Sequence, residues 1–526
     1  MTEGARRRLV RLLVRRRAGL FAGTALLAIF VPFIASTPVR AIPAVAAAVA
    51  APDTGVPLSM LLPGGGGTTL GVGALLGLLV GVGLFAALLS LTQGMLVARL
   101  NARLAADVRI RLADHLLRQP PSYHQKMGPG PLLGALTADA EMIALHLGNL
   151  LPAGFGVVSG AIVWSLTLGG GLTGAGVATS AAAGVVGAVF VVLGVTNGLA
   201  ARMTGRRAGS SQLQAQRARD EALGALTESL GAADEIQANA AEEEETERLA
   251  VRIREMAARQ ERVAAWGTLA GSLTQVVVVI AVPALVVTAT LLDAPAAALA
   301  VMLPSLTFLQ AAIGSATGLW TQVKMTRPAL DRAADLLAEE PAIVDPVGAK
   351  PLEEVRGALG FRELRFTYPG AEKPVLDGAD FEITPGSTVA IVGDGGSGKS
   401  TLLKLLLRFH DPDAGAVTLD GRDVREVPLR ELRRRVAMLG QFSKLFARSV
   451  RENLRMGAGA ATDDELRRAC KTAAAEPLLA KLAGGLDAIV DPGAANLSGS
   501  ERRRFALARV LARNPAVLLL DEPEGG

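Results

Sequence analysis

Long runs without a charged residue restrict this chain to folds that place much of it inside a membrane. Residues 18–37, 54–98, 150–201, 263–292 and 294–323 contain no Asp, Glu, Lys or Arg. A helix rises about 1.5 Å per residue, so about twenty apolar residues cross a hydrocarbon layer of about 30 Å. Half of all residues are hydrophobic and only 4% are aromatic, which favours membrane spans over one large soluble core.

Six spans follow from the way these runs divide. The glycines Gly64–Gly67 precede the second span, and Gly169–Gly171 with Gly174 predict a turn inside the run 150–201. Asp293, with Pro295 close behind it, separates the last two spans. The expected spans are 18–37, 68–98, 150–168, 177–201, 263–292 and 296–323.

Arginines set the expected orientation of these spans. They crowd the basic segment 1–17 before the first span, and the long loops 99–149 and 202–262. Cytoplasmic loops carry an excess of Lys and Arg, so these segments are predicted to be cytoplasmic and mostly helical. A cleavable signal peptide is the alternative for the N-terminus, but further spans follow it. We therefore expect a membrane domain over 18–325.

The C-terminal part predicts a second domain of the α/β class. The composition changes near Arg332, which indicates a linker over 326–355 and a domain over 356–526. The apolar run Val389–Val392 predicts a strand, and 401–408 predicts a helix. Between them lies a G-x-x-x-x-G-K-S loop, in the strand-to-helix context that a phosphate-binding loop requires. The residues expected to bind ATP here are Gly393, Asp394, Gly395, Gly396, Ser397, Gly398, Lys399, Ser400 and Thr401.

Each residue type in this loop suits a bound triphosphate. Glycines let backbone N–H groups approach the phosphates closely, and the following helix presents its positive end. Lys399 would add a positive charge, and the hydroxyl of Ser400 would bind Mg²⁺, which prefers oxygen ligands. ATP with Mg²⁺ is therefore the expected cofactor.

Two carboxylates follow a later apolar run. Val517–Leu520 predicts a buried strand that ends at Asp521 and Glu522. The carboxyl end of such a strand would lie beside the phosphate loop, where Asp521 would hold Mg²⁺ through water and Glu522 would polarise the attacking water. An acidic turn with a purely structural role is the alternative, and the loop upstream disfavours it.

The segment between these two motifs resembles the signature of the ATP-binding cassette (ABC) superfamily. It reads Asn496-Leu-Ser-Gly-Ser-Glu501 and opens a helix-like run over 502–509, just before the second strand. The resemblance implies that Ser498, Gly499 and Ser500 cap a nucleotide bound by an opposite subunit.

Other positions extend the resemblance to most of the chain. It implies that Tyr368 stacks on adenine, and that Gln441 reaches the metal and the attacking water. The implied architecture is an exporter-type half-transporter, an all-α six-helix transmembrane domain fused to an α/β P-loop ATPase domain. In that type, short coupling helices touch the ATP-binding domain, and 121–134 and 228–242 are the candidates here.

The sequence departs from the family pattern in two places. Ser500 and Glu501 stand where the family usually has glycine and glutamine, which resembles the weakened site of asymmetric pairs. The sequence ends at Gly526, whereas the family continues through a dimer-contact loop and a strand that carries a histidine. We expect either a truncated gene or fragment, or an impaired enzyme, and a chain that binds Mg-ATP but hydrolyses it slowly.

The predicted function is ATP-driven export by alternating access, in a homodimer or heterodimer of half-transporters. The alternative is a degenerate, non-hydrolysing partner subunit of a heterodimeric transporter. The nearly uncharged spans favour a hydrophobic or amphipathic cargo, although helix contacts through glycine and alanine explain the same composition. A net charge of +5 does not require a nucleic-acid partner.

Residue usage suggests where the protein works. Arginine-rich and alanine-rich usage suggests a bacterial source, and hence the inner membrane, with the ATP-binding domain in the cytoplasm. The single cysteine, Cys470, rules out an intrachain disulfide, and no motif surrounds it, so we expect a buried or idle thiol.

Overall fold

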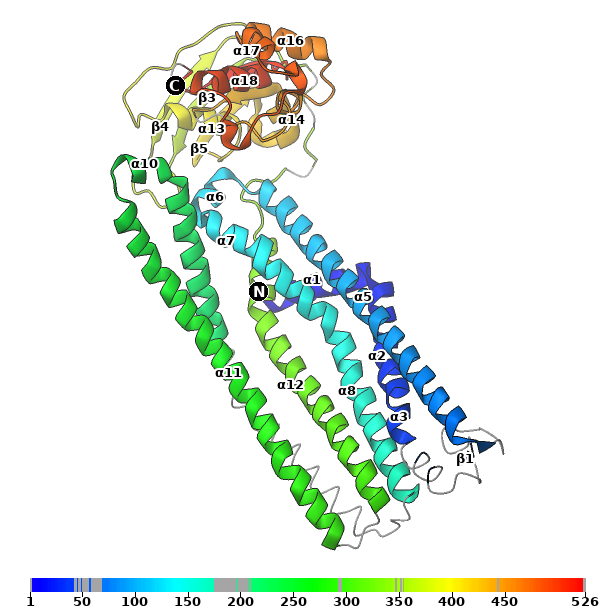
Figure 1. Ribbon diagram of the computed structural model, residues 1–526. Helices are drawn as coiled ribbons and strands as arrows, with labels where there is room; N and C mark the ends of the chain where they lie inside the picture. The colour runs from blue at the N-terminus through cyan, green and yellow to red at the C-terminus, as the bar shows by residue number, and fades with distance from the viewer. Residues whose placement is uncertain are drawn as a thin grey trace. The chain divides into compact units, whose positions relative to one another are not determined.

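The computed structural model divides the chain into two compact units, Met1–Glu340 and Pro341–Gly526 (Figure 1). Each unit is described by itself. The structure describes residues 2–41, 69–174, 210–291, 296–345, 348–350, 354–441 and 444–523, with isolated positions at 45, 49, 56, 57, 195, 207 and 352.

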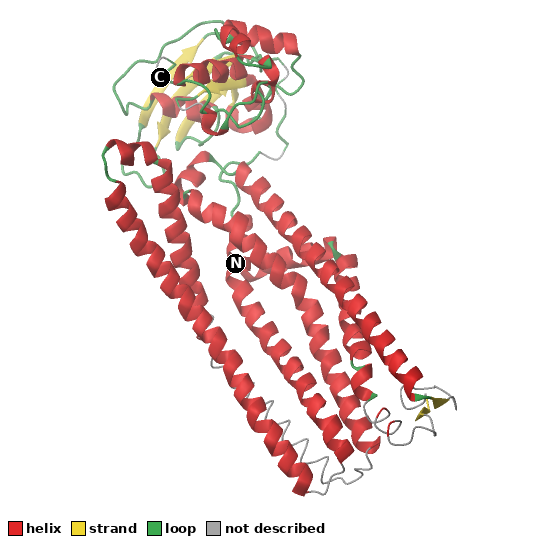
Figure 2. Ribbon diagram, viewed as in Figure 1, coloured by secondary structure: helices red, strands yellow, loops and turns green. Residues whose placement is uncertain are grey.

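The first unit is helical, and most of its helices are long (Figure 2). Its elements are α1 (Thr2–Arg16), α2 (Ala18–Ala35), α3 (Thr37–Arg40), β1 (Val56–Pro57), β2 (Thr69–Leu70), α5 (Val72–Arg118), α6 (Pro121–Met127), α7 (Pro129–Gly134), a π-helical turn (Ala135–Asp139), α8 (Ala140–Gly174), a helix over 210–231, α10 (Ala233–Ala238), α11 (Glu242–Leu291) and α12 (Ala296–Ala338).

Several of these helices fit the expected spans. Among the described residues, three helices are long and apolar enough to cross a membrane, Ala18–Ala35, Val72–Arg118 and Pro129–Val163. With 47 residues, α5 is much longer than the roughly twenty that a bilayer needs. The helices α11 and α12 run through the fifth and sixth expected spans. The expected span 177–201 lies outside the described residues except for position 195, so the number of spans stays a prediction.

The glycines Gly169–Gly171 do not break the helix as predicted, and the rest of the expected turn, residues 175–176, lies outside the described residues. Residues Gly169–Gly171 are helical, and α8 continues through them to Gly174. Glycine costs an exposed helix only about 1 kcal/mol relative to alanine, so neighbouring helical turns can carry a glycine triplet. The two candidate coupling segments each contain short helices, α6 and α7 in one and α10 in the other.

Several helices of this unit share a large apolar core. In that core α12 and α2 both pack against α8, and α2 also packs against α5. Leu100, Leu104 and Leu112 of α5 and Ile143 of α8 are completely buried there. The hydroxyl of Ser159 also donates to the carbonyl of Ala28 at 3.1 Å, which joins α8 to α2 inside the bundle.

A buried ion pair fixes the N-terminal segment to α5. The guanidinium of Arg17 donates to the Asp107 carboxylate through Nε at 2.8 Å and Nη2 at 3.0 Å. The Asp107 side chain is only 3% exposed, and Nη1 of Arg16 lies 3.3 Å from its Oδ1. A carboxylate buried at this depth needs such partners to offset its lost hydration.

Replacing Asp107 by asparagine is expected to lower the melting temperature of the detergent-solubilised protein by on the order of 5 °C, because two arginines lose their buried counter-charge. The matched control is Asp114→Asn, also on α5. Asp114 is 64% exposed and pairs only with Arg118, so its loss should have almost no effect. Equal melting temperatures for the two variants would contradict this role for Asp107.

The second unit combines two small sheets with short helices. Its elements are β3 (Leu359–Phe366), β4 (Leu376–Ile383), α13 (Lys399–Leu406), β5 (Ala414–Leu419), β6 (Arg422–Asp423), α14 (Leu429–Arg435), β7 (Val436–Leu439), α15 (Val450–Leu454), α16 (Asp463–Thr472), α17 (Glu476–Lys481), α18 (Gly499–Leu511) and β8 (Val517–Leu520), with 3-10 turns at Val424–Glu426, Gly485–Asp487 and Pro492–Ala494. One sheet is antiparallel in the order β4-β3-β5-β6, and the other is the parallel pair β7-β8.

The predicted strand at Val389–Val392 is not formed. These residues belong to no strand, and Val392 is 90% exposed. A strand exists only through its hydrogen-bonded neighbours, and no described segment pairs with this one. By contrast, the predicted strand Val517–Leu520 forms as β8.

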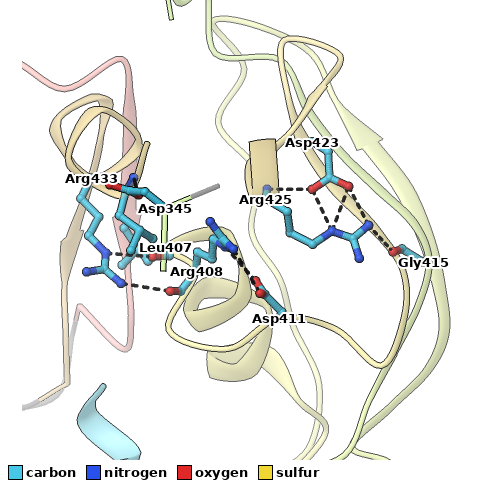
Figure 3. A network of polar contacts seen from close by, with 9 residues as sticks. Asp345, Leu407, Arg408, Asp411, Gly415, Asp423, Arg425 and Arg433 are labelled. Carbon is cyan, nitrogen blue, oxygen red and sulfur yellow. Dashed lines mark hydrogen bonds and ion pairs between the residues drawn. The ribbon is translucent and has the colours of Figure 1, made fainter. Parts of the chain in front are cut away.

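Polar contacts around α14 join it to the start of the second unit and to the end of α13 (Figure 3). Asp345 accepts a hydrogen bond from the Leu429 backbone N–H at the start of α14, at 2.6 Å. From the same helix, Arg433 donates to the carbonyls of Leu407 and Arg408 at 3.1 and 3.0 Å. Those carbonyls follow the last residue of α13, so this network fixes the helix that begins at the phosphate loop.

Candidate functional site

The glycine-rich loop enters α13 through left-handed backbone. Gly396 has φ 81° and Gly398 has φ 90°, conformations that other residues rarely adopt. A Cβ atom on Gly398 would lie 2.7 Å from the side chain of Leu376 and 3.1 Å from the carbonyl oxygen of Val375. Glycine is therefore required at Gly398 both for its conformation and for its close contact with β4.

Lys399 lies folded over this loop. Its ammonium donates to the carbonyls of Gly393 and Asp394 at 2.7 and 2.8 Å, and lies 3.4 Å from the hydroxyl of Ser397. The Lys399 ammonium is thus held against the backbone of the loop that is expected to bind phosphate. An anion there would meet this charge and the N-terminus of α13 together.

The structure brings together two of the expected metal ligands. The Ser400 hydroxyl, on the first turn of α13, donates to Oδ1 of Asp521 at 2.9 Å. Asp521 directly follows β8, and its backbone N–H donates to the carbonyl of Leu439 of β7 at 2.9 Å. A hydroxyl and a carboxylate at this separation form part of the oxygen set that Mg²⁺ prefers, so these residues fit that ion.

Gln441 and Glu522 meet at the same edge of the parallel pair. Leu439 of β7 lies opposite Leu520 of β8, so both strands end side by side. Just beyond these ends, the Gln441 amide donates to the carboxylate of Glu522. Glu522 itself has φ 47°, an uncommon conformation for a residue with a side chain. All of the expected metal and catalytic side chains therefore gather where β7 and β8 end.

Tyr368 sits in an aromatic cluster at the other side of α13. Its hydroxyl lies 3.1 Å from that of Thr401, and its ring packs edge-on against Phe366 and His410, with centroids 5.0 and 5.4 Å away. The ammonium of Lys404 lies 5.9 Å from the Tyr368 ring centroid. Burial, with a smaller contribution from Lys404, lowers the pKa of His410.

Sequence reasoning missed Phe366, His410 and Lys404 as neighbours of Tyr368. Phe366 could have been found, because alternate residues of an extended strand share a face, and Lys404 could have been found because it lies one helical turn beyond Ser400 on α13. His410 follows that helix in a loop, where spacing alone gives no signal.

The signature segment forms a helix N-terminus with a capping box. The hydroxyl of Ser498 accepts from the Glu501 backbone N–H at 3.3 Å, and the Glu501 carboxylate accepts from the Ser498 N–H at 2.8 Å. The hydrogen bonds that this carboxylate accepts from Ser498, first from its backbone N–H, lower the pKa of Glu501, so its carboxylate form is favoured. Ser500 lies within 3.3 Å of the Ser498 hydroxyl in the same turn. Glu501, one of the two departures from the family, therefore stabilises the start of α18.

Cys470 has no place in this chemistry. It is completely buried in the core around α16, and burial raises the pKa of its thiol to about 11. A buried thiol with a raised pKa is unreactive, in agreement with the expectation from sequence.

These features define the class of the protein, a P-loop nucleotide-binding domain joined to a helical membrane domain. The chain belongs to the ABC transporter family. Residues 376–525 match the family described as ABC transporter, and residues 54–315 match the ABC transporter transmembrane region.

Two curated relatives each align with little more than a third of this chain. An ATP-dependent lipid A-core flippase from Chromobacterium violaceum is 41% identical over 184 residues, which cover 35% of this chain and 31% of the flippase. ABC transporter ATM1 from Toxoplasma gondii is 37% identical over 212 residues, which cover 37% of this chain and 19% of that protein. The aligned region thus spans less than a third of either relative.

The fold is shared more widely than the sequence. A bacterial Atm1-family ABC exporter, solved with ATP bound, superposes with a TM-score of 0.79 over 97% of this chain and 86% of its own. The sequences are 22% identical, so this likeness establishes the fold alone. The expected architecture, an exporter-type helical membrane domain fused to an ABC ATPase domain, is confirmed.

Proposed function

We propose that the protein exports a hydrophobic or amphipathic cargo across a membrane at the expense of ATP. Two hydrogen bonds carry this proposal, one between Ser400 and Asp521 and one between Gln441 and Glu522. Both lie beside the glycine-rich loop, which has Lys399 at its end. A site that only binds nucleotide has no need of the second pair. The fusion to a membrane domain of the ABC type couples this site to transport.

In this mechanism, the chain's own groups bind and orient ATP. The loop N–H groups and Lys399 hold the terminal phosphates, while Tyr368 stacks on adenine beside His410. Ser400 and Asp521, with Gln441 close by, would hold Mg²⁺, which neutralises phosphate charge when bound.

Glu522 takes the role of general base. Its carboxylate accepts a proton from the attacking water as that water approaches the terminal phosphorus. Gln441, which donates to this carboxylate, fixes its direction and offers its own oxygen to the same water. Most of the rate enhancement in phosphoryl transfer comes from such positioning and charge stabilisation.

The working unit is a dimer of half-transporters. In it, Ser498, Gly499 and Ser500 of one subunit cap the nucleotide held by the loop of the other. The capping box leaves the N–H groups at the start of α18 in a fixed arrangement, which suits a phosphate. Closure of two such sites would move the segments around α6, α7 and α10 and so alternate the access of the membrane domain.

A cavity of about 570 Å³ in the first unit is a candidate passage for cargo. It lies among α2, α5, α8 and α12, and the described residues that line it include Ser90, Gln93, Asn149 and Ser315 and no charged side chain. Neutral polar groups among apolar ones suit an amphipathic molecule. One relative is named as a lipid A-core flippase, which agrees with a lipid-like cargo.

The alternative, a non-hydrolysing partner subunit, finds no support in the site. Lys399, Asp521 and Glu522 are all present, and the last two contact Ser400 and Gln441. The departure at Glu501 has a structural role in the capping box. We place the protein in a bacterial inner membrane with its ATP-binding domain in the cytoplasm.

Reconstitution into lipid vesicles tests this function. Fluorescent phospholipid analogues should move between leaflets only when ATP is supplied on the side of the second unit. A non-hydrolysable ATP analogue serves as the control and should support no sustained movement. ATP hydrolysis without movement of any lipid analogue would remove lipids from the proposed cargo, and the absence of hydrolysis would contradict the proposal itself.

A further inference from the structure

A second cavity, of about 620 Å³, lies within the first unit between α1, α8 and α12. It is separate from the candidate cargo cavity and shares no lining residue with it. Its lining combines arginines of α1 with apolar and amide side chains of the other two helices. The lining residues are Arg6, Arg7, Val10, Arg11, Val14, Arg15, His146, Leu147, Leu150, Gln322, Val323, Thr326 and Leu330.

The basic side of this cavity holds two arginines with no ion-pair partner among the described residues. Arg6 is paired with Asp331 at 2.8 Å, and Arg7 with Glu3 at 2.5 Å. Arg11 and Arg15 lie one helical turn apart on α1, and both are exposed. No acidic group of the described residues lies within ion-pair distance of either arginine. The cavity therefore offers two uncompensated guanidinium groups, which bind phosphate well.

An amide on α12 adds a second, independent sign of a ligand. The side-chain oxygen of Gln322 is buried and accepts no hydrogen bond from the described residues. The hydroxyl of Thr326, one turn further along α12, donates to the backbone carbonyl of Gln322 at 2.6 Å and lies 2.5 Å from Nδ1 of His146, so it does not pair with that side-chain oxygen. A buried acceptor without a partner destabilises the fold, and a donor on a ligand would remove that cost.

The cavity also lies at the membrane surface expected from the sequence. Its α8 residues lie at the start of the span expected over 150–168, and its α12 residues lie at the end of the span expected over 296–323. On α1, Val10 and Val14 line the cavity beside the arginines, so the helix offers apolar and basic contacts together. A ligand there would have an anionic head among the arginines and a chain along Leu147, Leu150 and Val323.

We propose that this cavity binds the headgroup of an anionic phospholipid that carries hydroxyl donors, of the phosphatidylglycerol type. The phosphate pairs with Arg11 and Arg15, and a headgroup hydroxyl donates to Gln322. The proposal rests on the membrane orientation proposed above, but not on the cargo, the direction of transport or ATP hydrolysis. Its binding test therefore fails or succeeds independently of the proposed function.

The test is native mass spectrometry of the full chain in detergent, titrated with phosphatidylglycerol. Arg11→Ala and Arg15→Ala are each expected to weaken binding about five-fold, since one arginine near a lipid surface contributes about 1 kcal/mol. Arg8→Ala removes an arginine of the same helix that does not line the cavity, and should leave binding unchanged. Equal weakening by all three variants would show only diffuse attraction to the basic helix, and would overturn the site.

Two further arms identify the headgroup. Phosphatidylmethanol has the same charge as phosphatidylglycerol but no headgroup hydroxyl. The unmodified chain should bind it more weakly than phosphatidylglycerol, and Gln322→Leu should bind the two lipids equally well. No difference between the two lipids in the unmodified chain would remove Gln322 from the site. Inorganic phosphate should not compete at equal concentration. Effective competition would mean that the cavity takes a free anion, and the lipid assignment would be wrong.

Discussion

Replacing Lys399 by alanine is expected to raise the dissociation constant for ATP by about 100-fold or more, because a charge-assisted contact to the terminal phosphates is lost. In the structure its ammonium is held by the loop carbonyls of Gly393 and Asp394, so it is already placed where phosphate would arrive. Binding can be measured with a fluorescent ATP analogue on the purified protein.

Two companion variants make this result specific. Lys399→Met keeps the length of the side chain and removes only the charge, so it should behave like Lys399→Ala. Lys471→Ala removes an exposed lysine of α16 in the same unit, and should bind ATP like the unmodified protein. Normal binding by both Lys399 variants would contradict the assignment of this loop to phosphate.

The phosphate loop could be predicted from the sequence because its chemistry is local. Glycine at Gly396 and Gly398 reflects a left-handed backbone, and Lys399 and Ser400 are placed by the first turn of the helix that follows. The approach of Asp521 to Ser400 needed one further step, that β8 is parallel to a neighbour and ends beside the loop. General rules of α/β folds supply that step.

Other features depend on contacts between distant segments and could not be predicted in this way. The run Val389–Val392 has the composition of a strand, but a strand also needs a paired neighbour. The glycines at 169–171 predicted a turn, although α8 carries them as helix. In both cases the conformation that the local composition favours is not the one adopted, because contacts with distant segments also decide it. A local sequence pattern does not contain those contacts.

The role of Glu501 shows a third kind of limit. From the sequence, its charge in the signature segment indicated a weakened site. The structure shows the carboxylate accepting from the backbone of Ser498, a contact that glutamine could also make. Residue identity alone could not separate an added charge near phosphate from an ordinary helix cap.

Replacing Glu522 by glutamine is expected to lower ATP turnover by about 100-fold or more while ATP binding stays within about two-fold of the unmodified protein. The variant keeps an oxygen that can accept from Gln441, so the local geometry is preserved. What it loses is a carboxylate able to take a proton from water. The loss should therefore fall on turnover and leave the affinity for ATP almost untouched.

Glu501→Gln is the matched control, because it makes the same chemical change at the start of α18. Its oxygen can still accept from the Ser498 N–H, so turnover should change by no more than about two-fold. The turnover of all three proteins is measured as the rate of phosphate release under saturating Mg-ATP. Glu522→Gln turning over like Glu501→Gln would mean that Glu522 is not the base. The contact with Gln441 would then be structural, since a group that accepts the proton cannot be replaced by an amide without cost.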